Sequence, residues 1–366
     1  MLVAGGQVVA VAPSLPSVSD LPVEELDLDG AVLSPGFVDA HVHVTGGGGE
    51  GGAETRVPPV APSRFFSAGV TTVIGLLGTD GSTRSIAELL ATCRGLDAIG
   101  LTAFAYTGSY EVPPVTLTGS VRGDLVHVDR IVAIGEVAIS DHRSSQPTFD
   151  ELVRLAADAH VAGLMTRKAG LLHLHLGDGP RGLSMLRRAL DETELPARVF
   201  HPTHTNRNPA LWEETKSWGE RGGYADLTAF PGDDLDGARA AWVCAAEWLA
   251  EGLDPRRLTM SSDGGGCLPM FDADGNLIRM GIGDSGTLAT DVAAMVAAGV
   301  PLERAFALVT ANVADLFRLR AKGRVGVGLD ADLVAWTSDL RPDLVIARGR
   351  VVVRAGVPIV RGPFEA

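Results

Sequence analysis

The sequence is poor in cysteine, with three cysteines among 366 residues. Cys93, Cys244 and Cys267 form no CxxC pair and no disulfide framework, a pattern that suits the reducing cytoplasm. No lysine or arginine precedes Arg56, so the N-terminus lacks the positive region of a secretory signal. No apolar run is long enough to span a membrane. We therefore expect a soluble cytoplasmic protein that does not bind membranes.

Positive charge is also scarce. Lysine and arginine together number 31, against 45 aspartates and glutamates, which gives a net charge of −14. A nucleic-acid-binding surface requires the opposite balance, so we expect no nucleic-acid partner. Only three of the basic residues are lysines, namely Lys168, Lys216 and Lys322.

Hydrophobic residues make up 46% of the chain, which is enough for a large core. Short β-branched runs alternate with longer helical patterns, and this alternation predicts an α/β fold, a TIM-like (β/α)8 barrel over residues 33–322. The predicted strands are 38–44, 70–77, 101–107, 131–140, 171–177, 197–205, 224–230 and 258–264. Helical patterns occupy 85–96, 149–165, 182–193, 211–223, 237–253, 287–300 and 302–319.

The two chain ends do not fit this barrel. Residues 1–12 are strand-like, as are 330–337 and 342–360. We expect these segments to meet in a small β-sandwich built from residues 1–32 and 323–366.

The segment HVHVTGGGGE, residues 41–50, contains the first candidate ligands. His41 and His43 are two residues apart, so on a strand their side chains share a face, as two ligands of one metal must. The glycines that follow permit close backbone approach, and Glu50 would lie near the mouth of the same site. The alternative interpretation of this segment alone is a half-buried strand followed by a flexible loop.

Further polar residues occur at the C-terminal ends of the predicted strands, the face on which barrel enzymes carry their active sites. Any one histidine is more often structural, but five strand ends that all supply ligand types favour a metal site, most simply zinc. The residues are His41, His43, Tyr110, Glu136, Arg143, His175, His204, Arg207 and Asp263.

The motifs around these residues resemble the metal-dependent amidohydrolase superfamily, and specifically the isoaspartyl (β-aspartyl) dipeptidases. The resemblance covers most of the predicted barrel. HxH alone marks only the superfamily, whereas the glycine run ending in Glu50 is far more specific when it is combined with AISDHRS and THxNRN. The motifs are HVHVTGGGGE (41–50), GLLGTD (75–80), TGSY (107–110), LTGSVR (117–122), AISDHRS (138–144), PTHTNRN (202–208) and SSDGGG (261–266).

This resemblance implies two divalent metal ions, with zinc as the simplest choice. One ion would be held by His41, His43 and Asp263, and the other by His175 and His204. The family pattern selects His175 over His173 and His204 over His201. We expect His173 and His201 to be structural or to support the ligands from behind. The remaining histidines match no ligand position, and we expect them in surface or packing roles: His127, His142 and His160.

The family's bridging ligand is a carbamylated lysine on the fourth strand, but this chain has Glu136 at that position. No lysine is positioned to substitute, and Glu111 is a weaker alternative bridge. Glu136 keeps the charge of a carbamate, although its side chain is roughly 3–4 Å shorter. We therefore expect Glu136 to bridge the two ions, with hydroxide between them as the nucleophile. The resemblance implies that Asp263 transfers the proton to the leaving amine and that Tyr110 stabilises the oxyanion.

The resemblance also implies a substrate pocket. Glu50 would bind the ammonium of a β-aspartyl dipeptide, and Arg143 and Arg207 its two carboxylates. An alternative for Arg143 is a salt bridge with its neighbour Asp141. Three further residues would complete the pocket through backbone and hydroxyl contacts: Gly48, Gly49 and Thr79. Cys267 stands where the family has a substrate-binding serine, and the alternative for this cysteine is a nucleophile.

These features predict a cytoplasmic metallopeptidase that hydrolyses β-aspartyl dipeptides. The alternatives are another amidohydrolase, such as a cyclic-imide hydrolase or an N-acyl-amino-acid deacylase, or a catalytically silent paralogue. The family resemblance implies a homo-oligomer, with an octamer as one form, and a small β-sandwich that is reduced because the N-terminus begins late.

Overall fold

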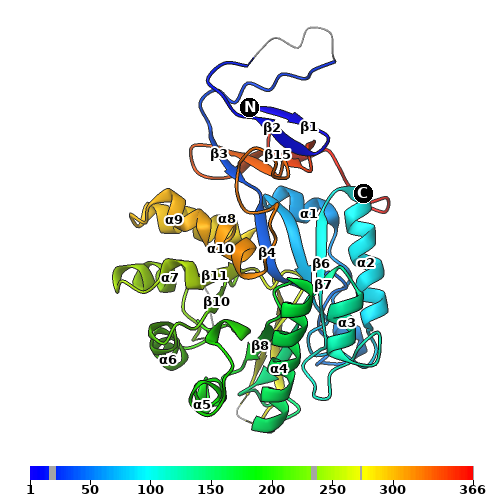
Figure 1. The fold of residues 1–366 in the computed structure, drawn as a ribbon, viewed down its shortest axis with the longest axis vertical. Coiled ribbons are helices and arrows are strands. Elements are labelled where there is room, and N and C mark those ends of the chain that lie inside the picture. The colour runs from blue at the N-terminus through cyan, green and yellow to red at the C-terminus, as the bar shows by residue number, and fades with distance from the viewer. Residues whose placement is uncertain (16–21, 232–236, 273, 366) are drawn as a thin grey trace.

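The computed structural model describes residues 1–15, 22–231, 237–272 and 274–365. Its larger part is an α/β barrel, and a smaller all-β part at one end contains both chain termini (Figure 1). Within the described residues, the model has no helix that combines the length and the apolar character needed to cross a bilayer.

Eight parallel strands form the barrel, as the sequence predicts. Six of them lie in one sheet in sequence order, and two more pair separately. The barrel closes where Val42 pairs with Gly264 and where Thr205 donates its N–H to Asp226 O at 3.2 Å. The strands are β4 (Phe37–Val42), β5 (Val70–Gly75), β6 (Thr102–Thr107), β7 (Ile131–Ile139), β8 (Leu172–Leu176), β9 (Phe200–Thr203), β10 (Ala225–Thr228) and β11 (Leu258–Ser261).

Helices cover the outside of the barrel (Figure 1). Local sequence fixes several of their starts: Ser85 and Asn208 accept from backbone N–H groups as N-caps, and Thr148 with Glu151 forms a capping box. The helices are α1 (Pro62–Ser67), α2 (Ile86–Ile99), α3 (Val121–His127), α4 (Phe149–Thr166), α5 (Ser184–Glu192), α6 (Pro209–Glu220), α7 (Ala241–Ala250), α8 (Thr287–Ala297), α9 (Leu302–Ala307) and α10 (Ala311–Leu316). Short 3-10 turns occur at η1 (Ala53–Thr55), η2 (Ala197–Val199) and η3 (Pro255–Arg257).

The prediction of one helical pattern over 302–319 was wrong, because the segment forms two short helices, α9 and α10. The backbone carbonyls between the two helices accept hydrogen bonds from barrel strands. Leu308 O accepts from Met260 N at 3.0 Å, and Val309 O accepts from Val38 N at 2.8 Å. These tertiary hydrogen bonds replace the continuation of the helix.

The smaller part contains two antiparallel sheets. One is the hairpin of β1 (Leu2–Ala4) and β2 (Gln7–Ala10). The other has the order β17-β16-β15-β14-β3, so strands from both ends of the chain share it. Its strands are β3 (Val32–Pro35), β14 (Leu333–Trp336), β15 (Pro342–Ala347), β16 (Arg350–Arg354) and β17 (Val357–Pro358). The expected boundary at residues 32–33 falls within β3, which leads through Gly36 directly into β4.

An additional antiparallel hairpin follows the last barrel strand. It consists of β12 (Cys267–Phe271) and β13 (Leu277–Ile282). Asn276 donates its N–H to Asp272 Oδ1 at 2.8 Å, and Gly275 has a positive φ of 83°, which glycine adopts readily. The strand prediction did not include this hairpin, although the Asp274–Gly275 pair between two apolar runs is a hairpin signal.

Candidate metal centre and substrate pocket

The predicted ligands converge at the C-terminal ends of the barrel strands. His41 lies in β4, Glu136 in β7 and His175 in β8, while His204 and Asp263 follow β9 and β11. These five side chains are all buried, and so is His43. His204 and Asp263 have left-handed backbone conformations, with φ of 59° and 53°. Such conformations are uncommon outside glycine and cluster at functional sites.

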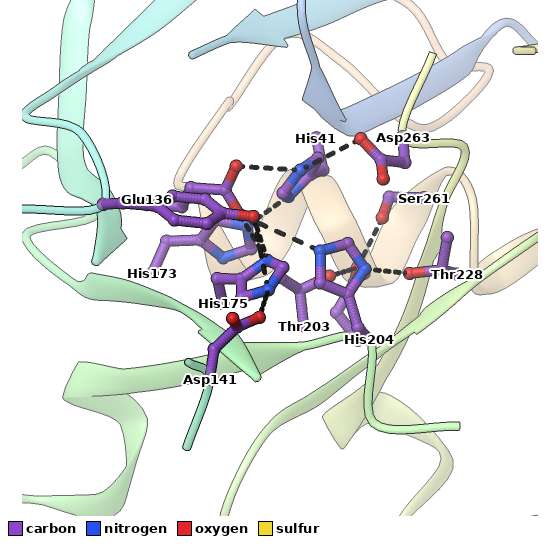
Figure 2. A network of polar contacts seen from close by, with 12 residues as sticks. His41, Glu136, Asp141, His173, His175, Thr203, His204, Thr228, Ser261 and Asp263 are labelled. Atoms are coloured by element: carbon purple, nitrogen blue, oxygen red, sulfur yellow. Dashed lines mark hydrogen bonds and ion pairs between the residues drawn. The ribbon is translucent and has the colours of Figure 1, made fainter. Parts of the chain in front are cut away.

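Glu136 occupies the middle of this cluster (Figure 2). Its Oε1 lies 3.5 Å from His41 Nε2 and 3.6 Å from His43 Nε2. Its Oε2 lies 3.3 Å from His175 Nδ1 and 3.8 Å from His204 Nε2. Each oxygen of the carboxylate therefore faces one of the two predicted ligand sets.

Asp263 completes the first set. Its Oδ1 lies 3.4 Å from His41 Nε2 and 3.1 Å from His43 Nε2. A Cβ placed on Gly266 would lie 2.0 Å from this Oδ1, so the carboxylate needs a glycine at that position. Two sets of three residues have ligand atoms within 4.8 Å of one another: His41, His43 and Asp263, and His41, Glu136 and His204.

Several atoms at the centre of the cluster are buried without a hydrogen-bond partner. They are His41 Nε2, both oxygens of Glu136, and Asp263 Oδ1. Buried polar groups are nearly always paired or bound to an ion, so this convergence fits a divalent cation. Imidazole and carboxylate are the donors that zinc uses in catalytic sites.

The charges in the cluster agree with this interpretation. Burial alone would raise the pKa of Glu136, but the surrounding histidines hold it well below its usual range. Burial would likewise raise the pKa of Asp263, but His41 and His43 outweigh it and hold that pKa far below its usual range. Burial would lower the pKa of His41, but Glu136 and Asp263 outweigh it and raise that pKa to about 9. The two carboxylates are therefore ionised at neutral pH, the form in which they can bind a cation.

Three of the histidines are oriented through their second ring nitrogen. His175 Nε2 bonds Asp141 Oδ2 at 2.9 Å, His204 Nδ1 bonds Thr228 Oγ1 at 2.7 Å, and His41 Nδ1 bonds His173 Nε2 at 2.8 Å. Such contacts fix the tautomer of a ligand and the direction of its free lone pair. The sequence interpretation gave His173 a structural role or a supporting role behind the ligands, but it did not identify Asp141 and Thr228 as partners of His175 and His204.

Tyr110 lies beside the cluster, with its hydroxyl 2.7 Å from His175 Nδ1. Burial and the charge of Glu136 raise its pKa well above the normal value, so the phenol keeps its proton. A protonated phenol at this position is a hydrogen-bond donor.

A cavity of about 610 Å³ opens over the cluster. The β12–β13 hairpin forms one wall, to which Phe271 and Met280 contribute. His142, which we expected in a surface or packing role, lines the cavity and contacts Phe271 edge-on, with ring centroids 4.7 Å apart. The predicted pocket residues that line the cavity are Gly48, Glu50, Thr79, Tyr110, Arg143, Arg207 and Cys267. Gly49 is not among the lining residues.

Glu50 is held at the cavity wall by one oxygen only. Thr79 Oγ1 donates to Glu50 Oε1 at 2.9 Å, while Oε2 is buried without a partner. Cys267 lies nearby, and burial, Glu50 and Asp263 raise its thiol pKa to about 12. A thiol that stays protonated at neutral pH is a poor nucleophile, which argues against the alternative for Cys267.

The two predicted arginines differ in their partners. Arg143 is bonded to Asp141, as its alternative interpretation anticipated, and its Nη1 also lies 3.5 Å from Glu50 Oε1. Arg207 has a weaker contact, 3.8 Å from the exposed Asp178, and its buried Nε has no partner. Arg207 therefore retains donor capacity for a ligand.

The lysines lie away from the cluster. Lys168 Nζ donates to Leu125 O at 2.7 Å and Val128 O at 2.6 Å, Lys216 lies on α6, and Lys322 pairs with Asp332 in the all-β part. Glu111 lies 3.4 Å from Ser109 Oγ and is in neither of the two ligand sets. Among the described residues, Glu136 is the group placed to bridge both sets.

Comparisons with known proteins agree with this geometry. A model of the amidohydrolase family matches residues 32–352. A β-aspartyl dipeptidase from Fervidobacterium islandicum AW-1, solved in complex with a β-Asp-Leu dipeptide, is 41% identical, covers 91% of this chain and 88% of its own, and has a TM-score of 0.86. A second structure of a β-aspartyl dipeptidase from that organism is 38% identical over 97% and 92% of the two chains, with a TM-score of 0.87. An allantoinase from Escherichia coli O139:H28 is 25% identical over 91% of this chain and 81% of its own. The resemblance inferred from the motifs is therefore confirmed.

Proposed function

Because the chain belongs to the amidohydrolase family, we propose that it is a metal-dependent dipeptidase that hydrolyses β-aspartyl dipeptides. The observation that carries this proposal is the set of charged groups around the metal cluster. Glu50 presents an unpaired carboxylate oxygen, and Arg143 and Arg207 present guanidinium groups, in one cavity. A β-aspartyl dipeptide has one ammonium and two carboxylates, so the pocket and the ligand match in charge.

We propose that six residues would hold two zinc ions. His41, His43 and Asp263 form one set, His175 and His204 form the other, and the two oxygens of Glu136 are shared between them. The distances around Glu136 support this division, since each oxygen faces one set. When bound, divalent ions activate water and polarise the scissile carbonyl.

The protein's own groups have separate roles in this proposal. Asp263 accepts a proton from the attacking water and delivers it to the leaving amine. Tyr110 donates its phenolic hydrogen to the developing oxyanion. Glu50 binds the substrate ammonium with support from Thr79, and Arg207 and Arg143 bind the carboxylates. Gly48, Gly49 and Cys267 shape the wall through backbone and thiol contacts.

The direct test is to compare β-Asp-Leu with α-Asp-Leu as substrates of the zinc-loaded protein. We expect hydrolysis of the β isomer and none of the α isomer. Both isomers have a free ammonium on the aspartyl residue, but the α-carboxylate beside it is free only in the β isomer and forms the peptide bond in the α isomer. Equal rates on the two isomers, or activity only on a cyclic imide or an N-acyl amino acid, would refute the assignment. Failure to bind metal would indicate a silent paralogue.

We further propose that the enzyme works in the cytoplasm as a homo-oligomer, with an octamer as the form to test, and without a nucleic-acid partner. The scarcity of cysteine and the net charge of −14 support the location and the absence of nucleic acid. Light scattering of the purified protein measures its oligomeric state.

A further inference from the structure

A line of polar side chains leads from His41 away from the cavity and into the barrel. His41 Nδ1 lies 2.8 Å from His173 Nε2, and His173 Nδ1 lies 2.9 Å from His201 Nδ1. His201 Nε2 lies 3.0 Å from Thr259 Oγ1, and that hydroxyl donates to Asp226 Oδ1 at 2.5 Å. All five side chains are fully buried. They form one continuous chain of hydrogen bonds, which we call the histidine relay.

Asp226, at the inner end of the relay, determines which atom donates each hydrogen bond. A carboxylate only accepts hydrogen bonds, so the hydrogen in its short contact with Thr259 comes from the threonine. The other acceptor near this hydroxyl, Ala225 O, is farther away at 3.4 Å. Because the single hydroxyl hydrogen is used on Asp226, the Thr259 oxygen must accept from His201 Nε2–H. Two further hydroxyls donate to the same carboxylate, those of Thr203 and Ser261.

The remaining steps follow from the chemistry of neutral imidazole, which donates through one nitrogen and accepts through the other. His201 donates through Nε2, so its Nδ1 accepts from His173 Nδ1–H. His173 Nε2 then accepts from His41 Nδ1–H. With Nδ1–H used on His173, the lone pair that His41 would offer to a metal is on Nε2, the nitrogen that faces Glu136 and Asp263.

The two inner histidines are held neutral and in place. Both rings are fully buried, which disfavours a charged imidazole, and burial lowers the pKa of His201 to about 4. Tyr106 stacks on His173 with ring centroids 4.9 Å apart, and Phe317 packs edge-on against His201 at 5.6 Å. This packing fixes the planes of the two rings, whereas the hydrogen bonds of the relay decide which ring nitrogen carries the proton.

We propose that Asp226 acts through Thr259, His201 and His173 to hold His41 in the tautomer that presents Nε2 to the metal. These four are positioning residues, because none of them touches substrate or metal. The relay deepens the proposed metal site and does not depend on which peptide is cleaved. The supports of the other ligands are shorter, since His175 Nε2 bonds directly to the carboxylate of Asp141 and His204 Nδ1 bonds directly to the hydroxyl of Thr228.

The polarity of the relay is measurable in the unmodified protein. Zinc-loaded protein labelled with ¹⁵N-histidine gives the tautomer of each ring by long-range ¹H–¹⁵N correlation. We expect the proton on Nδ1 of His173 and on Nε2 of His201. A proton on Nδ1 of His201 would overturn the proposal, and this measurement needs no variant.

The contribution of the histidine relay to metal binding is measured with the variant Thr259→Val. This substitution keeps the shape of the side chain and removes its hydroxyl. We expect the His173 and His201 tautomers to become mixed and the zinc affinity, measured by chelator competition, to fall about 10-fold. Thr259→Ser restores the hydroxyl and should restore both readouts. An affinity within twofold of the unmodified protein for a folded Thr259→Val would overturn the proposal.

Phe317→Leu is the matched control, because it changes packing against His201 without removing a hydrogen bond of the relay. We expect its tautomers and zinc affinity to match those of the unmodified protein. A 10-fold loss in this variant would show that packing, and not the relay, orients His41. Neither readout uses peptide hydrolysis, so a wrong substrate assignment would leave both results unchanged.

Discussion

The Arg143 guanidinium donates two hydrogen bonds to the carboxylate of Asp141, Nη2 to Oδ2 at 2.7 Å and Nε to Oδ1 at 3.1 Å. This bidentate pairing offsets much of the charge of the arginine. Asp141 Oδ2 also bonds His175 Nε2, so the pair connects the cavity wall to a candidate metal ligand. Among the ion pairs of the described residues, Arg207 has the 3.8 Å contact with exposed Asp178, and it keeps more of its charge for a bound carboxylate.

Replacement of Arg207 should therefore damage substrate capture severely. We expect Arg207→Met to lower kcat/KM for β-Asp-Leu at least 100-fold, because an unpaired carboxylate in a desolvated pocket costs roughly 3 kcal/mol or more. The control is Arg221→Met, which removes an exposed ion pair with Asp191 at the end of α6. Steady-state kinetics measure both variants. A loss below threefold for Arg207→Met would mean that this arginine is only structural.

Glu50 is predicted to recognise the substrate ammonium. Succinyl-leucine is β-Asp-Leu without its amino group, so it tests this contact by itself. The unmodified enzyme should prefer β-Asp-Leu over succinyl-leucine, and Glu50→Gln should reduce that preference at least 10-fold, since a charged partner contributes more than about 1.5 kcal/mol. An unchanged ratio of the two kcat/KM values would exclude the ammonium role.

Glu136 is predicted to make metal binding independent of carbon dioxide. Two divalent ions close together need a bridging anion, because they repel strongly in a site of low dielectric constant. The carboxylate of Glu136 is a permanent anion, whereas a carbamylated lysine must be rebuilt from bicarbonate. Metal-stripped protein should thus regain full activity with zinc alone, and bicarbonate should add nothing.

The control for this experiment is Glu136→Gln, which keeps the shape and removes the charge. We expect it to bind less than the two zinc ions per chain of the unmodified protein, as measured by elemental analysis. Recovery of the unmodified protein only with bicarbonate would contradict the bridging role.

Asp291 on α8 should make the fold less stable as pH rises. The side chain is 9% exposed, and burial raises its pKa from 3.8 to about 7, against a backbone hydrogen bond from Trp242 that lowers it. The folded state therefore holds this proton between pH 4 and 7 where the unfolded state releases it, and stability falls through that window. The pKa difference corresponds to at most about 4 kcal/mol.

We expect Asp291→Asn to be more stable than the unmodified protein at pH 8 and to lose that advantage near pH 4. Urea denaturation at a series of pH values measures the difference in free energy of unfolding. A constant difference across the series would contradict the assigned pKa.

Local patterns and motifs in the sequence predicted the barrel and the candidate metal ligands. Strands with inward-facing residues at every second position, alternating with capped helices, specify a (β/α)8 barrel. The HxH spacing then places His41 and His43 on one face, and the barrel topology brings His175, His204 and Asp263 to the same end. The selection of His175 and His204 over His173 and His201 came from the family resemblance and not from spacing.

What the tertiary structure decided is how groups from distant strands pair with one another. His173 and His201 are equivalent to other core histidines in sequence, and only their contacts with His41 and Thr259 align them into the histidine relay. The break between α9 and α10 likewise depends on backbone carbonyls that accept hydrogen bonds from β4 and β11. The pairing of Asp141 with His175 is of the same kind, whereas its pairing with Arg143 was already an alternative in the sequence. Sequence periodicity encodes which face a side chain occupies, but hydrogen-bond direction depends on the atoms that folding brings within about 3 Å.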